Sequence, residues 1–160
     1  MEEVAIPRRF PTDAEIEFAA KLARGEVEAV NMRHLALKHL LYPKLDEHLY
    51  APKHVKTWVQ VLAIGDRAAV VGLPGELFVE LGLRIKRESP FKHTFVCGLA
   101  NDYVGYVPTL RAFKEEGPLE TSGSYETTIG PNVLAPEAGD IIVETAIKIL
   151  KKLYEKVSSN

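Results

Sequence analysis

The chain has 160 residues, 46% of them hydrophobic, which favours a single folded domain over residues 1–160 and excludes a disordered chain. The formal net charge of −2 is spread along the sequence without a basic stripe, so a nucleic-acid-binding protein is not expected. The apolar stretches are short and interrupted, which predicts no membrane span. The first ten residues carry acids and lack an apolar signal core, which favours a cytoplasmic protein.

The single cysteine, Cys97, bears on both redox chemistry and metal binding. One cysteine excludes an internal disulfide and a cysteine-rich zinc site. Its apolar flanks are typical of a strand in the core, so we expect a buried, structural thiol.

The segment before residue 57 predicts two helices. A capping-box pattern at Thr12 begins the first, which should end near Gly25. The second is expected from about Val27 to Leu41, with Pro43 stopping it. Residues 45–56 are polar and are expected to be irregular.

Three strands are predicted in the middle of the chain. Thr57–Ile64 is rich in β-branched and aromatic residues, and a Gly-Asp turn separates it from Ala68–Gly72, so this pair reads as a hairpin. The second of these strands is nearly all apolar, which predicts burial on both faces. Thr94–Leu99 is the third strand.

Helices are predicted around these strands. One follows Glu76, with Phe78, Leu81 and Ile85 on one stripe. A short helix is expected over residues 110–116, then a long loop from Gly117 to Pro136 and a last helix over residues 138–157. The alternation predicts the α/β class, with a mixed sheet flanked by helices.

Two strand ends carry the residues of chemical interest. The first strand-end turn, Gly72 to Glu76, delivers a carboxylate to the start of a helix, where the local pattern alone favours a role in complementing the helix dipole. The second, Asn101 to Thr109, holds Tyr103 and Tyr106. These tyrosines read either as core anchors or as phenols offered to a metal or an oxyanion. A tyrosinate would need a nearby cation at neutral pH.

Other catalytic patterns are missing from the sequence. The five histidines form no zinc motif, and each reads as a solvated or capping residue. No glycine-rich loop has nucleotide-binding spacing, and no serine lies in a nucleophile elbow.

Taken together and in order, four segments resemble the neutral/alkaline ceramidase family. They are Val70–Glu76 with its PGE motif, Gly98–Thr109 with its paired tyrosines, Tyr125–Leu134 with its YE and GP motifs, and Pro136–Gly139 at the start of the last helix. The resemblance covers the chain from about Pro7 to Leu153.

The resemblance implies a zinc amidohydrolase, whose metal is held by two histidines, a glutamate and a tyrosine. It implies that Glu76 and Tyr106 are the glutamate and tyrosine ligands, and that Tyr125 acts at the substrate amide. An alternative alignment puts Leu119 in place of Tyr125, which would lose the phenol. In such a family, zinc polarises the amide carbonyl and activates water.

In that family the zinc histidines and a substrate-gripping serine lie upstream of everything present here. The chain therefore resembles the C-terminal part of a catalytic domain and should bind zinc weakly alone, since hydrolytic zinc sites use three protein ligands. Three readings stay open: a split hydrolase of N-acyl amides completed by a separately encoded N-terminal half, a non-catalytic module that homo-oligomerises, and an unrelated α/β protein.

Overall fold

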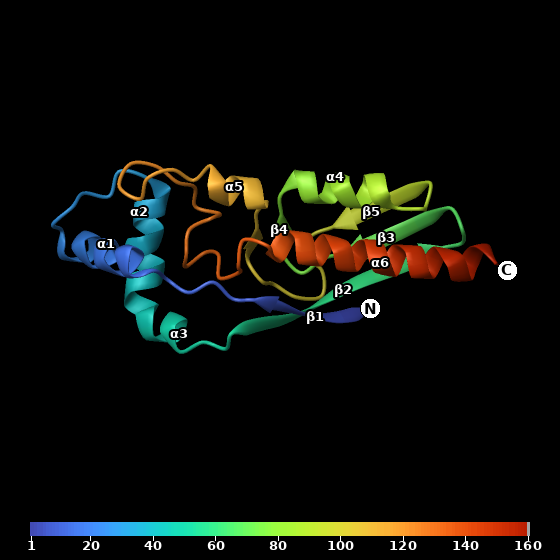
Figure 1. The fold of residues 1–160 in the computed structure, drawn as a ribbon, viewed down its shortest axis with the longest axis horizontal. Coiled ribbons are helices and arrows are strands. Elements are labelled where there is room, and N and C mark those ends of the chain that lie inside the picture. Colours follow the sequence, from blue (N-terminus) through green and yellow to red (C-terminus); the bar gives the residue numbers. More distant parts are fainter. Residues whose placement is uncertain (160) are drawn as a thin grey trace.

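A mixed four-stranded sheet and a cluster of short helices lie at opposite ends of the computed structural model, which describes residues 1–159 (Figure 1). The strand order is β1–β2–β3–β5, with β1 and β3 antiparallel to β2, and β5 parallel to β3. The strands are β1 (Glu2–Pro7), β2 (His54–Ile64), β3 (Ala68–Gly72) and β5 (His93–Cys97). The predicted α/β class with a mixed sheet is confirmed.

The long strand β2 joins two halves of the sheet. Its first part pairs with β1, from Pro7 opposite His54 to Glu2 opposite Val59. Its second part pairs with β3, so the predicted hairpin is confirmed. Strand β1 was not predicted, and β2 begins three residues earlier than expected, because these ends gain their order from pairing with each other.

Two amphipathic helices cover one face of the sheet (Figure 1). Helix α6 (Ala138–Ser158) packs on β1 and β2, while α4 (Val79–Glu88) packs on β5 and against α6. Both helices were predicted. The inward strand residues and the inner stripes of the helices form the main core, whose fully buried members include Ile6, Val59, Val71, Leu73, Ile85, Ile142 and Leu150.

Within residues 1–159, no helix packs on the opposite face of the sheet, and this corrects two predictions. In β3, Ala69 and Val71 are buried, but Ala68 and Val70 are only half-buried, so the strand is not buried on both faces. Cys97 is exposed, not buried. Alternation along β5 places it on the uncovered face, and an apolar local sequence cannot specify which face a helix will cover.

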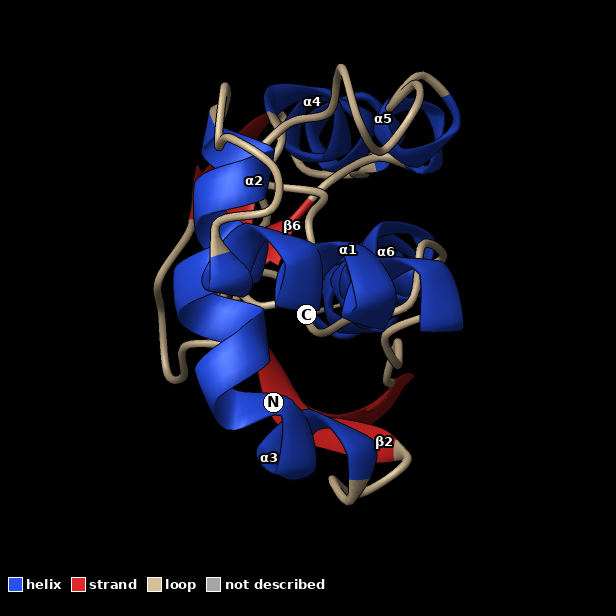
Figure 2. Cartoon of the chain, turned by 90° about the vertical axis from the view of Figure 1, so that its left-hand side faces the viewer, coloured by secondary structure: helices blue, strands red, loops and turns tan. Residues whose placement is uncertain are grey.

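The helical end, which faces the viewer in Figure 2, has helix boundaries that differ from the prediction. Helix α1 (Asp13–Arg24) has the predicted capping box and ends at Gly25. The second helix begins later than expected, as α2 (Met32–Ala36), because Asn31 caps it through His34 N–H.

This second helix also does not stop at Pro43. It continues as a π-helical segment η1 (Leu37–Leu41) and a 3₁₀ turn η2 (Tyr42–Lys44), and α3 (Leu45–Leu49) follows. Pro43 is tolerated because it lies in the first turn of η2, where its missing N–H needs no partner. The segment 45–56 is therefore partly helical and partly strand, not irregular. The helices share a second core of Phe18, Ala19, Leu22, Leu37, Leu41 and Ile129.

Short elements lie between the two ends. They are a two-stranded parallel sheet of β4 (Glu76–Leu77) and β6 (Tyr106–Val107), and helix α5 (Leu110–Lys114). The long predicted loop follows α5 and leads to α6. In residues 1–159, no helix has the length and apolar composition needed to cross a bilayer.

Candidate functional site

Strand pairing brings Glu76 and Tyr106 side by side. They are register partners in the β4–β6 sheet, where Glu76 N–H donates to Gly105 O at 3.0 Å and Phe78 N–H donates to Val107 O at 3.1 Å. Glu76 thus lies in a strand three residues before α4, and not in the first turn of that helix as the local pattern favoured. Both side chains are half-buried.

The loop between β5 and β6 is hydrogen-bonded to residues 73–75, the segment that precedes Glu76. Three backbone N–H groups of the loop donate to it: Leu99 to Gly75 O at 3.1 Å, Ala100 to Leu73 O at 2.8 Å, and Val104 to Pro74 O at 2.8 Å. Leu99 and Asn101 have positive φ angles of 55° and 71°. Such an angle is strained for a leucine, and it persists only where the surrounding structure holds the backbone in place.

Gly75 permits the close approach of these two segments. A Cβ atom at this position would lie 2.5 Å from Gly105 O and 3.0 Å from a methyl of Val104. No side chain fits at that separation, so the absence of one lets β4 and β6 pair.

Tyr103 is a third member of the cluster. Its hydroxyl donates to Glu76 Oε1 at 3.3 Å, while its backbone N–H donates to Asp102 Oδ1 at 2.8 Å. The other oxygen of Asp102 accepts from Thr57 Oγ1 at 2.9 Å, which ties the loop to β2. The sequence indicates Tyr103 only as one of a tyrosine pair, because spacing does not reveal which phenol faces the carboxylate.

Tyr125 completes the cluster from the long loop. Its ring packs edge to face on Tyr106, with 5.9 Å between centroids and an interplanar angle of 84°. Leu119, the competing position, packs against the helical core, and its carbonyl accepts from the His34 ring at 3.1 Å. Tyr125 is therefore the residue of the two that lies beside Tyr106.

A buried arginine anchors the loop that carries Tyr125. Arg33, only 5% exposed, pairs with Glu116 at 3.3 Å and donates to Ser122 O at 3.3 Å. Glu116 also accepts from Thr127 Oγ1 at 3.0 Å, on the far side of Tyr125. The loop is thus fixed on both sides of the tyrosine.

Loss of hydration and the nearby carboxylate both raise the pKa of the neighbouring phenols. Partial loss of hydration, followed by the hydrogen bond and negative charge of Glu76, raises the pKa of Tyr103. Partial loss of hydration, followed by the charges of Glu76 and Glu126, raises the pKa of Tyr106. Both are neutral donors at physiological pH, and a cation would be needed to make either an anionic ligand.

The donors present here make up only part of a zinc site. Glu76 and Tyr106 offer oxygen ligands, but among residues 1–159 no three His, Cys, Asp or Glu side chains gather around a metal position. His34 is buried in the helical end, and His93 is exposed at the start of β5. The residues of this chain alone do not fit a hydrolytic zinc site.

No protein-family model and no curated protein matches the sequence. Solved structures that share its fold include the neutral ceramidase from Pseudomonas aeruginosa and a ceramidase complexed with C2. Each superposes with a TM-score of 0.52 and 23% identity over 66% of this chain. The match spans 16% of each ceramidase chain, so the present chain corresponds to a small part of them. The resemblance to ceramidases that the sequence motifs indicated is thereby confirmed at the level of the fold.

Proposed function

We propose that this chain is the C-terminal part of a ceramidase-like zinc amide hydrolase whose histidine ligands come from a separately encoded N-terminal half. The observation that carries the proposal is the pairing of Glu76 with Tyr106, with Tyr103 and Tyr125 in contact with them. The fold shared with part of two ceramidases supports the same reading. By analogy with those enzymes, the substrate class is an N-acyl amide.

Each residue of the cluster has a role in this proposal. Glu76 and Tyr106 are the two zinc ligands that this chain contributes. Tyr103, which donates to Glu76, holds the carboxylate in place, as hydrogen-bonded partners of metal ligands commonly do. Tyr125 keeps its proton and donates to the oxygen that gains charge when the amide is attacked. Zinc, when bound, supplies the polarisation of the carbonyl and the activation of water.

Calorimetric titration with zinc tests the proposal. The isolated chain should bind zinc weakly, since two protein ligands rarely suffice. A mixture with the polypeptide from a neighbouring open reading frame that carries two histidines should bind it tightly. Glu76→Ala and Tyr106→Phe should abolish the tight binding. The matched controls Glu47→Ala and Tyr50→Phe change exposed residues of the helical end and should leave it unchanged.

The same titration addresses the non-catalytic alternative. The incomplete set of metal donors in residues 1–159 is the observation that favours a binding or structural module. If neither the chain nor the mixture binds zinc, and the chain forms a symmetric oligomer that covers Glu76 and Tyr106, the hydrolase proposal is wrong.

A further inference from the structure

Strand β5 is the last strand on its side of the sheet, and its outer edge is unpaired within residues 1–159. His93 N–H donates to Arg67 O and Cys97 O accepts from Leu73 N–H, so alternate residues starting at His93 face the β3 side. In a strand, the intervening residues face the other way. The N–H and C=O groups of Thr94 and Val96 therefore point outward from the sheet.

This edge lacks the features that keep exposed strands from pairing. Sheets protect free edges with prolines, charges or bulges. The opposite edge strand, β1, begins with Glu2 and Glu3 and ends at Pro7. Strand β5 is a regular run of five residues, HTFVC, without a proline or an acidic or lysine residue.

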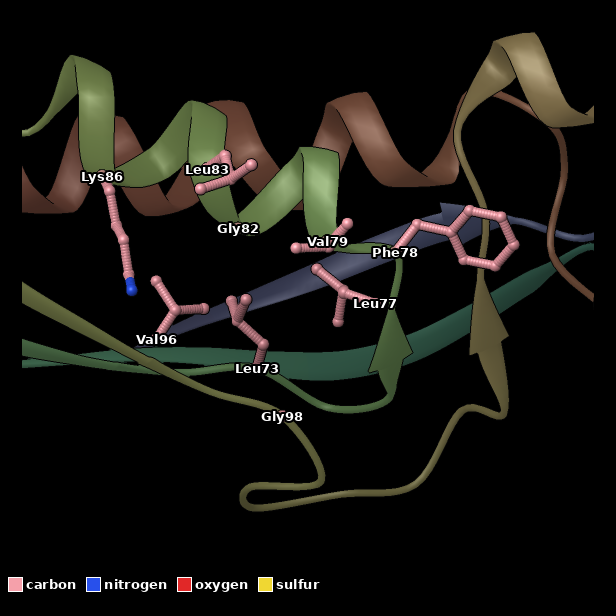
Figure 3. Close-up of a pocket in the computed structure, with 9 residues that line it drawn as sticks. All are labelled: Leu73, Leu77, Phe78, Val79, Gly82, Leu83, Lys86, Val96 and Gly98. Atoms are coloured by element: carbon pink, nitrogen blue, oxygen red, sulfur yellow. The ribbon is translucent and has the colours of Figure 1, made fainter.

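Apolar surface flanks the edge on both faces of the sheet. On the helix side, α4 and β5 enclose a mainly apolar groove of about 310 Å³, lined by Leu73, Val79, Leu83 and Val96 among others, with Lys86 as its one charged side chain (Figure 3). Val79 is 69% exposed and Leu83 is 55% exposed. On the uncovered face, Phe95 of β5 is 57% exposed. Exposed apolar surface of this extent around a free edge marks a site of association.

We propose that the β5 edge receives a β-strand from the polypeptide that completes the candidate site, extending the sheet by one strand. This inference rests on the proposed function and names how the partner docks. The outward backbone groups of Thr94 and Val96 are complementary to another strand. Apolar side chains of that strand, alternating between its two faces, would cover the groove on one side and Phe95 on the other.

The position of the edge relative to the site fits this occupant. The candidate site follows the carboxyl ends of β3 and β5, and the groove reaches Leu77, the neighbour of Glu76. A strand added parallel to β5 would also end there, about 4.8 Å farther along the sheet, where its following residues can supply ligands. In the two ceramidases, 16% of the chain holds the shared fold, so most of their length lies outside it.

A second copy of the chain is the other candidate occupant. It would satisfy the same backbone groups, but it would bring only a second Glu76 and Tyr106, and not the two histidine ligands that the proposed function assigns to the N-terminal half. The site would stay incomplete, so a different polypeptide is the occupant that the proposed function requires.

Site-specific photo-crosslinking in the cells that encode the chain tests the proposal. Benzoylphenylalanine in place of Phe95 should form an adduct with an extended segment of a different polypeptide, identified by mass spectrometry of the joined peptides. The same probe in place of Tyr50, 83% exposed at the helical end, is the positional control and should not capture that segment.

A matched pair of variants tests the backbone contact itself. Val96→Pro removes an outward N–H, and edge strands accept proline at such positions, so the β3–β5 ladder should remain intact. Adduct yield should fall about tenfold or more, because the partner's carbonyl loses its donor. Val96→Ala keeps the N–H and should stay within about twofold. If Val96→Pro does not fold, amide exchange replaces it: the Val96 N–H of the wild-type complex should exchange at least about tenfold more slowly than in the isolated chain.

Each outcome has a separate meaning. An adduct between two copies, an adduct insensitive to loss of the Val96 N–H, an unprotected Val96 amide, or no adduct would overturn the strand-addition proposal. A strand-dependent complex that fails to bind zinc would keep the docking mode and refute the hydrolase. A zinc-binding complex that crosslinks only through the probe at position 50 would support the hydrolase and refute strand addition at β5.

Discussion

Replacing Gly75 by alanine should separate the two segments that build the candidate site. The added Cβ would lie 2.5 Å from the backbone oxygen of Gly105, and neither backbone segment can yield as a side chain could. We expect loss of the hydrogen bonds from Glu76 N–H to Gly105 O and from Val104 N–H to Pro74 O. Two such bonds contribute about 1 kcal/mol each, and the forced shift adds roughly 1–2 kcal/mol.

The free energy of unfolding should therefore fall by about 3–4 kcal/mol, and Tm by roughly 6–16 °C, in a chain of this size. Urea unfolding followed by the fluorescence of Trp58 measures the free energy, and thermal unfolding followed by circular dichroism measures Tm. Gly82→Ala, within helix α4, is the matched control, because the added Cβ would meet only a methyl of Val96, at 3.8 Å. It should stabilise by about 0.4–1 kcal/mol. Equal stability of Gly75→Ala and wild type would refute the close-approach argument.

Three further predictions concern the groups around the site. Arg33→Ala breaks a buried ion pair, so it should lower the free energy of unfolding by about 3–5 kcal/mol and speed amide exchange in the loop around Tyr125. The control Arg87→Ala, at an exposed position, should change the free energy of unfolding by less than about 0.5 kcal/mol. Glu76→Gln should lower the pKa of Tyr103 and Tyr106 in an ultraviolet titration, while Glu80→Gln should not; an unchanged titration would show that the carboxylate does not act on these phenols. Because the folded chain holds tyrosine protons that the unfolded chain releases, the free energy of unfolding should decrease as pH rises above about 10, and less steeply in Glu76→Gln.

The sequence predicted the elements whose signals are local. The capping box at Thr12 and the apolar stripes of α4 and α6 specify helices by themselves, and the turn after Ile64 specifies a hairpin. Strand β1 has only Val4 and Ile6 as inward residues, and its order depends on pairing with β2, whose partner residues lie 47 to 57 positions away. Long-range pairing of this kind leaves no periodic signal in so short a segment.

The candidate site shows the same division between local and distant information. The positions of Glu76, Tyr106 and Tyr125 were assigned by resemblance, but their contacts required the structure. Glu76 lies in a strand because Tyr106 pairs with it, and Cys97 is exposed because the helices cover the other face of β5. The choice between Tyr125 and Leu119 depended on where a twenty-residue loop folds back, which Arg33 determines from the helical end.

The difference between the two edges of the sheet limits how the chain can assemble. A sheet with two unpaired edges can add further copies of the chain at both edges, and repeated addition forms filaments. Here β1 carries two carboxylates and a proline that disfavour pairing, whereas the outer edge of β5, among residues 1–159, carries neither. Growth should stop after one addition, giving closed pairs of fixed stoichiometry. A cell that makes this chain in excess of the proposed partner would accumulate molecules with an exposed, unpaired β5 edge, which is prone to aggregation. This favours balanced synthesis of the two polypeptides.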